Sequence, residues 1–377
     1  MSDKFNLYDV YEQNLNFLFG AGASFGFLPT LALAIKDADG KAYTFETLAK
    51  ELGKDNDNKH LYALLFMYYY KSCIEPGLPK KRNPRSRNRS QVLGQYKVFL
   101  QTLVSVLEKQ GPNDKKCNVY TTNYDNCLEV ASDSLISKQE VSCVVNDGSA
   151  GFQTRRFHTK NFNNRVVQKG IFDNHAECIP QINILHPHGS VYWKKINEGI
   201  TVNYQESDYA ISFDEDQTRL IAEFEKLVKD DTKSLADLIE YGEDEFEDWD
   251  KLNVEGFWDE YNDIPIVNPT KWKFHETVFE EAYYQILRHL SFELERPNTV
   301  LITFGFSFAD EHILHLVQRS LSNPSLTVFV SCYNDDEKQE MKKKFKGYSN
   351  VKFIAIDDDL TFTRFNKRVF TLKKGDE

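Results

Sequence analysis

An asparagine and an aspartate stand two residues apart in the middle of the chain, directly after an apolar run. They are Asn123 and Asp125, in the segment Thr121–Asp125, TTNYD. A carboxamide can hold a sugar hydroxyl or a water molecule, and a nearby carboxylate can fix the loop that carries it. The same two side chains can instead cap the helix that follows. The segment alone leaves both interpretations open.

Two histidines lie in the segment His186–Ser190, HPHGS, again directly after an apolar run. An imidazole can act as a general base near neutral pH, and a neighbouring glycine permits the close approach of a ligand. His188 is the histidine that directly precedes glycine. The alternative is a histidine that only supports the structure.

A glycine turn near the N-terminus has a composition suited to binding phosphate. In Gly20–Ser24, GAGAS, free backbone amides could meet a phosphate closely. The segment departs from the usual dinucleotide fingerprint, because Phe25 takes the place of its third glycine. Asp39 stands near the spacing of the ribose-binding acid, but its surroundings do not predict a second strand. A structural turn explains this segment equally well.

A fourth polar loop, Gly305–His312, GFSFADEH, follows the most apolar run of the chain. Gly305 and Ser307 are suited to contact a ribose or an adenine. Asp310 is equally suited to capping a helix.

The elements that must position these loops are short apolar strands that alternate with helices. The predicted strands are Asn14–Phe19, Lys116–Thr122, Ile182–Leu185, Thr299–Phe304, Leu326–Cys332 and Val351–Ile356. The helical patterns are Thr44–Lys71, Val92–Lys109, Asn126–Asp133, Lys273–Glu295 and Asp310–Ser320. This alternation predicts an α/β fold with a Rossmann-like, doubly wound parallel sheet. Ligands bind beyond the carboxyl ends of such strands, so the four polar loops should converge.

The length of 377 residues fits one elaborated domain over residues 1–377. A helical insertion is expected over residues 31–110 and an acidic one over residues 201–263. A hydrophobic share of 41% is enough to bury a substantial core. No apolar run approaches the ~20 residues of a membrane span, and the N-terminus does not resemble a secretory signal, so a cytoplasmic protein is expected.

The six cysteines are scattered without a Cys-x-x-Cys pair, so neither structural zinc nor a disulfide is expected. The net charge of −11 argues against a protein that mainly binds nucleic acid. Two charged segments stand out, the basic Lys80–Arg89 and the acidic Asp237–Asp263. Each is interpreted as solvated surface, or alternatively as a docking surface for a subunit or for phosphates.

The four loops, in this order, resemble the sirtuin-like superfamily, in which GAG-x-S, T-x-N-x-D, H-G and G-x-S loops surround NAD+. The matching segments are Gly20–Ser24, Thr121–Asp125, His188–Gly189 and Gly305–Ser307. The resemblance spans about residues 14 to 333. Two departures separate this chain from the protein-deacylating sirtuins. It cannot build their four-cysteine zinc module, and Phe27–Thr30, FLPT, stands where they have a Pro-Asp-Phe-Arg segment.

These departures resemble the bacterial branch whose members hydrolyse NAD+, many of them in antiphage defence. The resemblance implies cleavage of the nicotinamide–ribose bond, with NAD+ as substrate and no metal. It implies that Asn123 holds the ribose and the attacking water, that His188 is the general base, and that Asp125 supports the loop. It implies that the pyrophosphate is bound by Gly20, Ala21, Gly22 and Ser24. It implies that the adenosine end is bound by Gly305 and Ser307.

Control of such an enzyme is expected through a homo-oligomer or a partner subunit, since the chain has little length for a sensing domain. Chains of about this size within the family resemble those paired with a HerA-type hexameric ATPase, which is the expected partner. The alternative hypotheses are a subunit that senses NAD+ or ADP-ribose without turnover, and a nucleic-acid-associated subunit acting through Lys80–Arg89. Protein deacylation is the least favoured of these hypotheses.

Overall fold

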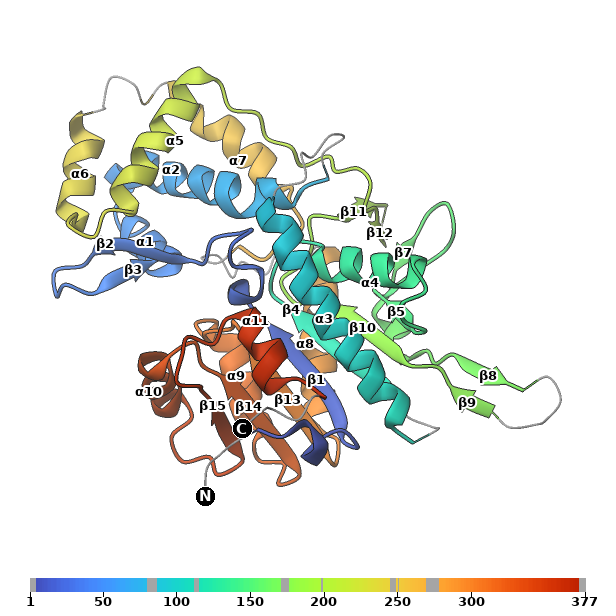
Figure 1. Ribbon diagram of the computed structural model, residues 1–377. Coiled ribbons are helices and arrows are strands. Elements are labelled where there is room, and N and C mark those ends of the chain that lie inside the picture. The colour runs from blue at the N-terminus through green and yellow to red at the C-terminus, as the bar shows by residue number, and fades with distance from the viewer. Residues whose placement is uncertain are drawn as a thin grey trace.

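A seven-stranded, all-parallel sheet forms the centre of the molecule (Figure 1). The computed structural model describes residues 5–79, 87–111, 115–170, 176–197, 199–244, 249, 251–268 and 278–372. The strands lie in the order β15-β14-β13-β1-β4-β10-β5. Their bounds are β1 Asn14–Phe19, β4 Lys116–Thr121, β5 Val144–Asn146, β10 Gln181–Leu185, β13 Thr299–Phe304, β14 Leu326–Ser331 and β15 Val351–Ile354. The predicted α/β fold is therefore confirmed.

All six predicted strands are present, each within about two residues of its expected bounds. The seventh strand, β5, was not predicted. It has only three residues, VVN, all half-buried at the edge of the sheet, and such a segment is too short to show a period.

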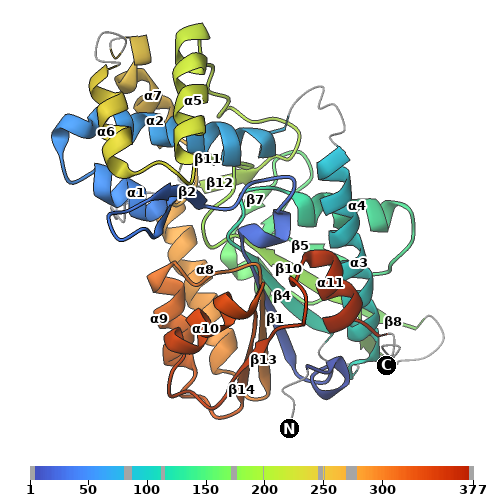
Figure 2. The ribbon, with the colours of Figure 1, turned by 60° about the vertical axis from the view of Figure 1, so that its left-hand side comes forward.

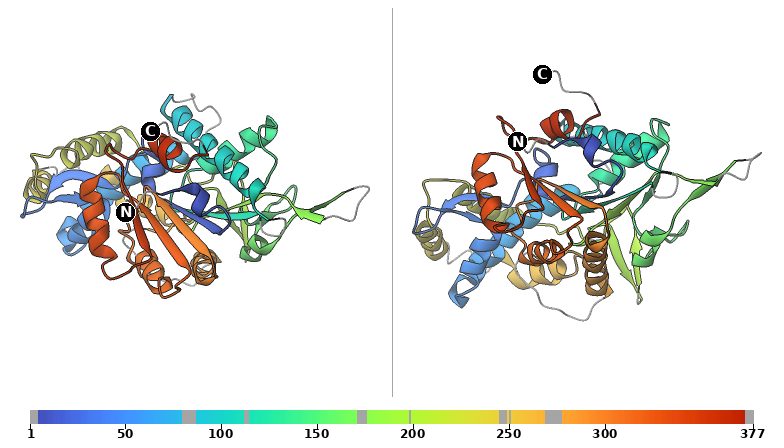
Figure 3. Two further views of the ribbon diagram at one scale, coloured as in Figure 1. Left: turned by 60° about the horizontal axis from the view of Figure 1, so that its bottom comes forward. Right: turned by 90° about the horizontal axis from the view of Figure 1, so that it is seen from below.

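Helices cover both faces of the sheet, as Figure 3 shows. One face packs against α3 (Arg87–Lys109), α4 (Cys127–Ser137) and the C-terminal turns α11 (Phe362–Arg364) and η8 (Phe365–Val369). The other packs against α8 (Val278–Glu295), α9 (Glu311–Ser320) and α10 (Asp335–Lys344). In β1, Phe17 and Phe19 point to the first face and Leu18 to the second. This double coverage explains why the strands are apolar along their whole length.

Two distant segments pack together into a helical module beside the sheet (Figure 2). The first holds β2 (Ala32–Lys36), β3 (Ala42–Thr44), α1 (Phe45–Leu52) and α2 (Lys59–Tyr69), and the second holds α5 (Glu215–Val228), α6 (Leu235–Asp244) and α7 (Val254–Asn262). They share one apolar core, in which Phe66 of α2 packs against Trp258 and Tyr261 of α7. The helix α3 lies apart from this module, because its buried stripe faces the sheet.

A ladder of asparagines crosses the interior of the sheet. Asn118 of β4 donates to Asn16 of β1 at 2.8 Å, and Asn183 of β10 donates to Asn118 at 2.8 Å. Asn146 of β5 continues the ladder with a 3.2 Å bond to Asn183. Each pair lies directly opposite in the strand register. Hydrogen bonds between neighbouring carboxamides satisfy these polar groups in an apolar interior.

The rest of the described chain forms smaller antiparallel structures. A four-stranded sheet contains β11 (Trp193–Ile196), β12 (Gly199–Val202), β7 (Arg156–Phe157) and β6 (Ser149–Ala150), while β8 (Val167–Lys169) and β9 (Ala176–Cys178) form a hairpin that projects from the body in Figure 1. The six cysteines all lie in the described ranges and are free thiols. Within the same ranges, no cluster of three potential metal ligands occurs. Nor does any helix there have the length and apolar character needed to cross a bilayer.

Candidate functional site

The four polar loops meet at one edge of the sheet. They follow β13, β1, β4 and β10, which are four consecutive neighbours, and parallel strands bring their carboxyl ends to the same edge. From β1 the chain runs outward through β4 to β5 at the edge of the sheet, comes back to β10, and then continues with β13 on the other side of β1. The loops after β1 and β13 therefore flank the point where the strand order reverses, the usual ligand position in this fold.

Three glycines allow the first and fourth loops to touch. A Cβ atom on Gly20 would lie 2.4 Å from the carbonyl oxygen of Gly305, and one on Gly22 would lie 2.7 Å from the Gly305 Cα. Gly305 itself has φ +62°, and a Cβ there would lie 2.6 Å from the Ala23 nitrogen. The Gly22 amide donates to the Gly305 carbonyl at 3.0 Å. Backbone contact between the loops thus requires glycine at all three positions.

The Ser24 hydroxyl joins three elements beneath these loops. Ser24 ends the short 3-10 helix η2 (Ala21–Ser24), is fully buried, and donates to Asp125 Oδ2 at 2.6 Å. It accepts from Asn123 Nδ2 at 3.1 Å, and Tyr96 of α3 lies at 3.1 Å. Since the Ser24 proton goes to the carboxylate, the Tyr96 hydroxyl donates to Ser24. Burial and the Asp125 charge raise the pKa of Tyr96, which keeps this donor protonated.

This network fixes the orientation of the Asn123 carboxamide. Its nitrogen is used by Ser24, and its backbone amide donates to Thr121 Oγ1 at 3.1 Å. Its carboxamide oxygen accepts no hydrogen bond from the described residues, so it can accept one from a ligand hydroxyl or a water.

Asp125 combines both interpretations that its sequence left open. One oxygen accepts from Ser24, and the other accepts from the Cys127 amide at 2.9 Å, in the first turn of α4. The carboxylate therefore supports the loop and also binds the first amide of α4, although the cap residue of that helix is Asn126.

His188 pairs with Asp310 across the site. The histidine is partly exposed, with 19% of its side chain accessible, and its Nε2 donates to Asp310 Oδ2 at 2.8 Å. The second oxygen, Asp310 Oδ1, caps α9 by accepting from the His312 and Ile313 amides at 2.8 and 3.0 Å. Burial favours the neutral acid, but the hydrogen bond and electrostatic interaction with His188, together with the two amides of α9, outweigh it and lower the pKa of Asp310. The pair is thus an imidazole beside an ionised carboxylate.

His186 has a different environment from His188. It is buried, with Nε2 donating to Glu129 Oε1 at 2.8 Å and Nδ1 lying 3.4 Å from the Asn123 carbonyl oxygen. Burial opposes the charged ring, but the Glu129 carboxylate overcomes this and raises the pKa of His186. With both nitrogens engaged by acceptors, His186 supports the Asn123 loop from below.

A short segment at the end of the second insertion ties the Asn123 and His188 loops together. Val267 accepts from the Tyr124 hydroxyl at 3.0 Å through its carbonyl and donates to the His188 carbonyl at 2.8 Å. The Pro265 carbonyl accepts from the Ser190 amide at 3.1 Å. Residues 265–267, named here the strap, therefore connect both loops to α7 and the helical module.

The fourth loop is held from α10. Lys344 Nζ donates to the carbonyl oxygens of Ser307 and Phe308 at 2.8 and 2.9 Å, and Phe308 has φ +52°. A phenylalanine in this left-handed region is strained and needs such support. The Ser307 side chain itself is exposed and available.

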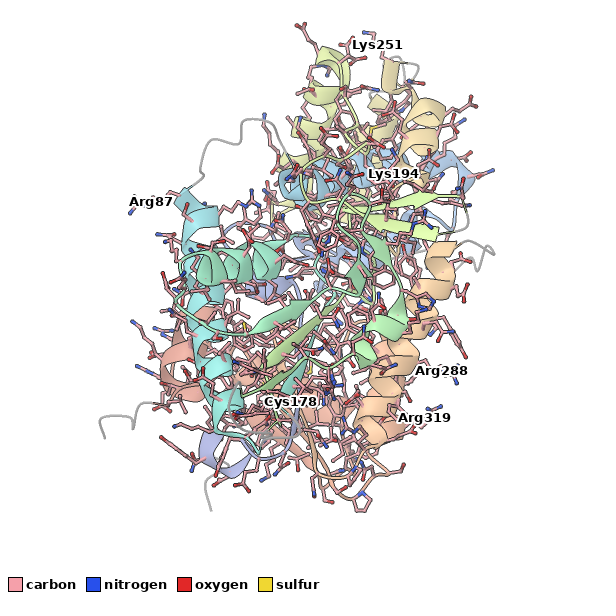
Figure 4. All side chains as sticks on the ribbon, turned by 90° about the vertical axis from the view of Figure 1, so that its right-hand side faces the viewer. Arg87, Cys178, Lys194, Lys251, Arg288 and Arg319 are labelled. Carbon is pink, nitrogen blue, oxygen red and sulfur yellow. The ribbon has the colours of Figure 1, made fainter. Side chains whose placement is uncertain are left out.

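Most of the basic segment Lys80–Arg89 lies outside the described residues. Arg87 begins α3 and lies at the molecular surface in Figure 4. Arg89 reaches the margin of the site, where it donates to Asn126 Oδ1 at 2.9 Å and lies over the Phe27 ring at 5.3 Å. Asp39 sits in the exposed β2–β3 turn.

Comparison with models of known protein families gives no match, and comparison with curated proteins gives none either.

The structure brings Asn123, Ser24 and Asp125 into direct contact, and it packs Gly20 and Gly22 against Gly305. Binding of pyrophosphate by Gly20, Ala21, Gly22 and Ser24, and of adenosine by Gly305 and Ser307, stays a prediction.

Sequence reasoning missed Tyr96, Lys344 and the strap. Tyr96 lies in the apolar stripe of the predicted helix Val92–Lys109 and was not singled out, although a buried tyrosine hydroxyl needs a partner. Lys344 binds backbone carbonyls of a loop that is distant in sequence, and the strap acts through its own backbone atoms, so neither contact leaves a signal in the sequence pattern.

Proposed function

We propose that this protein is a sirtuin-like NAD+ glycohydrolase, which cleaves the nicotinamide–ribose bond to give nicotinamide and ADP-ribose. The observation that carries the proposal is the meeting of four loops at neighbouring strand ends, where the Asn123 carboxamide is fixed and its oxygen has no hydrogen-bond donor among the described residues. The ordered motifs, which resemble the sirtuin-like superfamily, supply the choice of NAD+ as ligand.

In the proposed reaction the bond between the ribose C1′ and the nicotinamide nitrogen breaks, and its electron pair leaves with neutral nicotinamide. No strong acid is needed for that departure. The sugar becomes oxocarbenium-like, as in glycoside hydrolysis. Water then adds to C1′ and loses its proton. Asn123 orients the ribose and the water through its carboxamide oxygen, while His188 serves as general base at the ribose hydroxyls.

We further propose that the enzyme is a regulated, NAD+-depleting antiphage effector. Uncontrolled NAD+ hydrolysis would harm the cell that makes it. The proposed control is assembly into a homo-oligomer or with a HerA-type ATPase subunit.

The first experiment is NAD+ turnover by the purified full-length chain, with nicotinamide and ADP-ribose both quantified. We expect Asn123→Ala and His188→Ala each to lower kcat by about 10²-fold or more. The matched controls are Asn164→Ala and His315→Ala, since both side chains are exposed and neither belongs to the four loops of the site. These two should retain full activity.

The outcomes separate the hypotheses. NAD+ binding without turnover, even with a HerA-type ATPase added, would favour a non-catalytic sensor of NAD+ or ADP-ribose. Turnover that survives both substitutions would exclude the proposed residues. Absence of both binding and turnover would reject the proposed ligand.

A further inference from the structure

Asp310 is placed to do two tasks with its two oxygens. Oδ1 accepts from two backbone amides at the start of α9, while Oδ2 accepts from His188 Nε2 at 2.8 Å. The carboxylate is therefore attached to a rigid helix end, 122 residues away in sequence from the histidine it contacts. An exposed ion pair would gain little from such a contact, but the Asp310 side chain is only 16% exposed.

We propose that Asp310 is the positioning residue that sets the tautomer of His188 in the proposed hydrolysis. An ionised carboxylate has no proton to give, so the hydrogen bond requires the proton to lie on Nε2. In the neutral imidazole Nδ1 then carries no proton, so it is the nitrogen that can act as a base. This inference rests on the proposed function for its catalytic meaning, but the tautomer itself can be measured without substrate.

Because Asp310 uses one oxygen for the helix cap and the other for His188, a single substitution can test whether it sets the tautomer of His188. Asparagine is as good a helix cap as aspartate, so Asp310→Asn should leave α9 intact. An asparagine has only one oxygen, however, and the cap amides require it. The group facing His188 then becomes an NH2 donor, so Nε2 must accept and the ring proton must move to Nδ1. The nitrogen needed as a base is thereby blocked.

The other titratable groups around the pair do not compete for this proton. Tyr124 lies near Asp310, and the Tyr283 hydroxyl lies against Gly189. Burial raises the pKa of both phenols, which therefore stay neutral across the working pH range.

The test compares Asp310→Asn with Asp214→Asn in the full chain. Asp214 caps α5 in the helical module by accepting from the Gln217 amide at 2.8 Å, so its substitution makes the same chemical change at a helix end away from the site. The ring nitrogens of His188 are observed by NMR with 15N-labelled histidine and assigned by their loss in His188→Gln. We expect the Nε2–H tautomer in the wild type and in Asp214→Asn, and Nδ1–H in Asp310→Asn.

Turnover gives the second measurement. We expect Asp310→Asn to lower kcat by about 10²-fold or more with little change in KM, and Asp214→Asn to retain full turnover. A wild-type Nδ1–H tautomer would overturn the inference, as would an Asp310→Asn protein with unchanged tautomer and rate. If the tautomers change as expected but the wild type never consumes NAD+, the proposed hydrolysis fails and the positioning of His188 stands.

Discussion

The buried pair of His186 and Glu129 lies directly beneath the loop that carries Asn123. Both ring nitrogens of the histidine face acceptors, one of them the carbonyl of Asn123 itself. A charged imidazole satisfies both bonds at once, since it has two N–H groups. The protonation of His186 is therefore linked to the stability of the fold and of this loop.

A comparison of the wild type with Glu129→Gln should show this linkage. The folded-state pKa of His186 is raised above its ordinary value of 6.5, so the ion pair stabilises the protein fully below that pH. The contribution disappears as the pH rises through the raised pKa. We therefore expect the difference in Tm between the two proteins to be largest below pH 6.5 and to shrink as the pH rises through the raised pKa of His186.

The control for this series is Glu140→Gln, because that carboxylate is exposed and accepts a hydrogen bond from the neutral Gln101 side chain. Its Tm difference should stay constant with pH. A constant difference for Glu129→Gln as well would show that His186 is not charged in the folded protein.

Single residues were predicted from the sequence only where their position after a strand marked them. Asn123, Asp125 and His188 were found in this way. The partner of His188 was not, because Asp310 lies 122 residues further along and its side chain is equally typical of a helix cap. Contacts of this kind depend on the order of the strands in the sheet, which cannot be derived from a single sequence.

At the scale of elements, the contact between the loops after β1 and β13 depends on three glycines. The loops approach so closely that the backbone of one fills the space that a side chain on the other would need. The glycine-rich composition, interpreted at first as a phosphate-binding turn, therefore has a packing explanation that holds with or without a ligand.

We expect Gly20→Ala to destabilise the protein by about 3 kcal/mol, since its methyl group would overlap the Gly305 carbonyl. Turnover should fall as well, because the loop that carries Ser24 must shift. Chemical denaturation gives the free energy of unfolding. The matched control is Gly94→Ala in α3, where a Cβ meets no atom within 4 Å.

The Gly94→Ala control replaces a glycine inside a helix, so it should stabilise the protein by ~0.5–1 kcal/mol. Equal effects of the Gly20 and Gly94 substitutions would contradict the packing argument.

The strands and helices of the central sheet and its two covering layers could be predicted from the sequence. The strands are continuous apolar runs, and the helices have apolar residues at regular helical spacing. The helix Asp310–Ser320 was expected, and α9 begins one residue later with Asp310 as its cap. By contrast, β6 and β7 have two residues each and β8 and β9 have three, which is too short for any pattern. Tertiary contacts alone hold such strands in place.

The whole molecule joins a sheet and a helical module through the catalytic edge proposed here. Tyr124, next to Asn123, donates to the strap and accepts from Tyr69, the last residue of α2. Gly77 packs against Asp125 from the same side. A partner that moved the module would therefore displace the loops of Asn123 and His188 together.

The prediction at this scale uses two buried tyrosines. Tyr124→Phe removes the hydroxyl that bridges Tyr69 and Val267, and Tyr70→Phe removes one that bridges Tyr209 and Ile211 within the module. Each should cost about 1–3 kcal/mol, because buried partners lose their hydrogen bonds. Only Tyr124→Phe should also lower kcat for NAD+. Equal turnover in the two variants would show that the strap does not position the site.

The asparagine ladder has a consequence for how the chain finds its native alignment. A strand displaced by one position exchanges the side chains of its two faces, which disrupts the packing against both helix layers. A displacement by two positions keeps every side chain on its proper face, so burial alone discriminates poorly against it. The ladder does discriminate, because Asn16, Asn118, Asn183 and Asn146 meet only in the native alignment. A displacement of β1 by two positions would place Asn16 opposite Lys116 or Tyr120 instead of Asn118, so the ladder favours the native alignment during assembly.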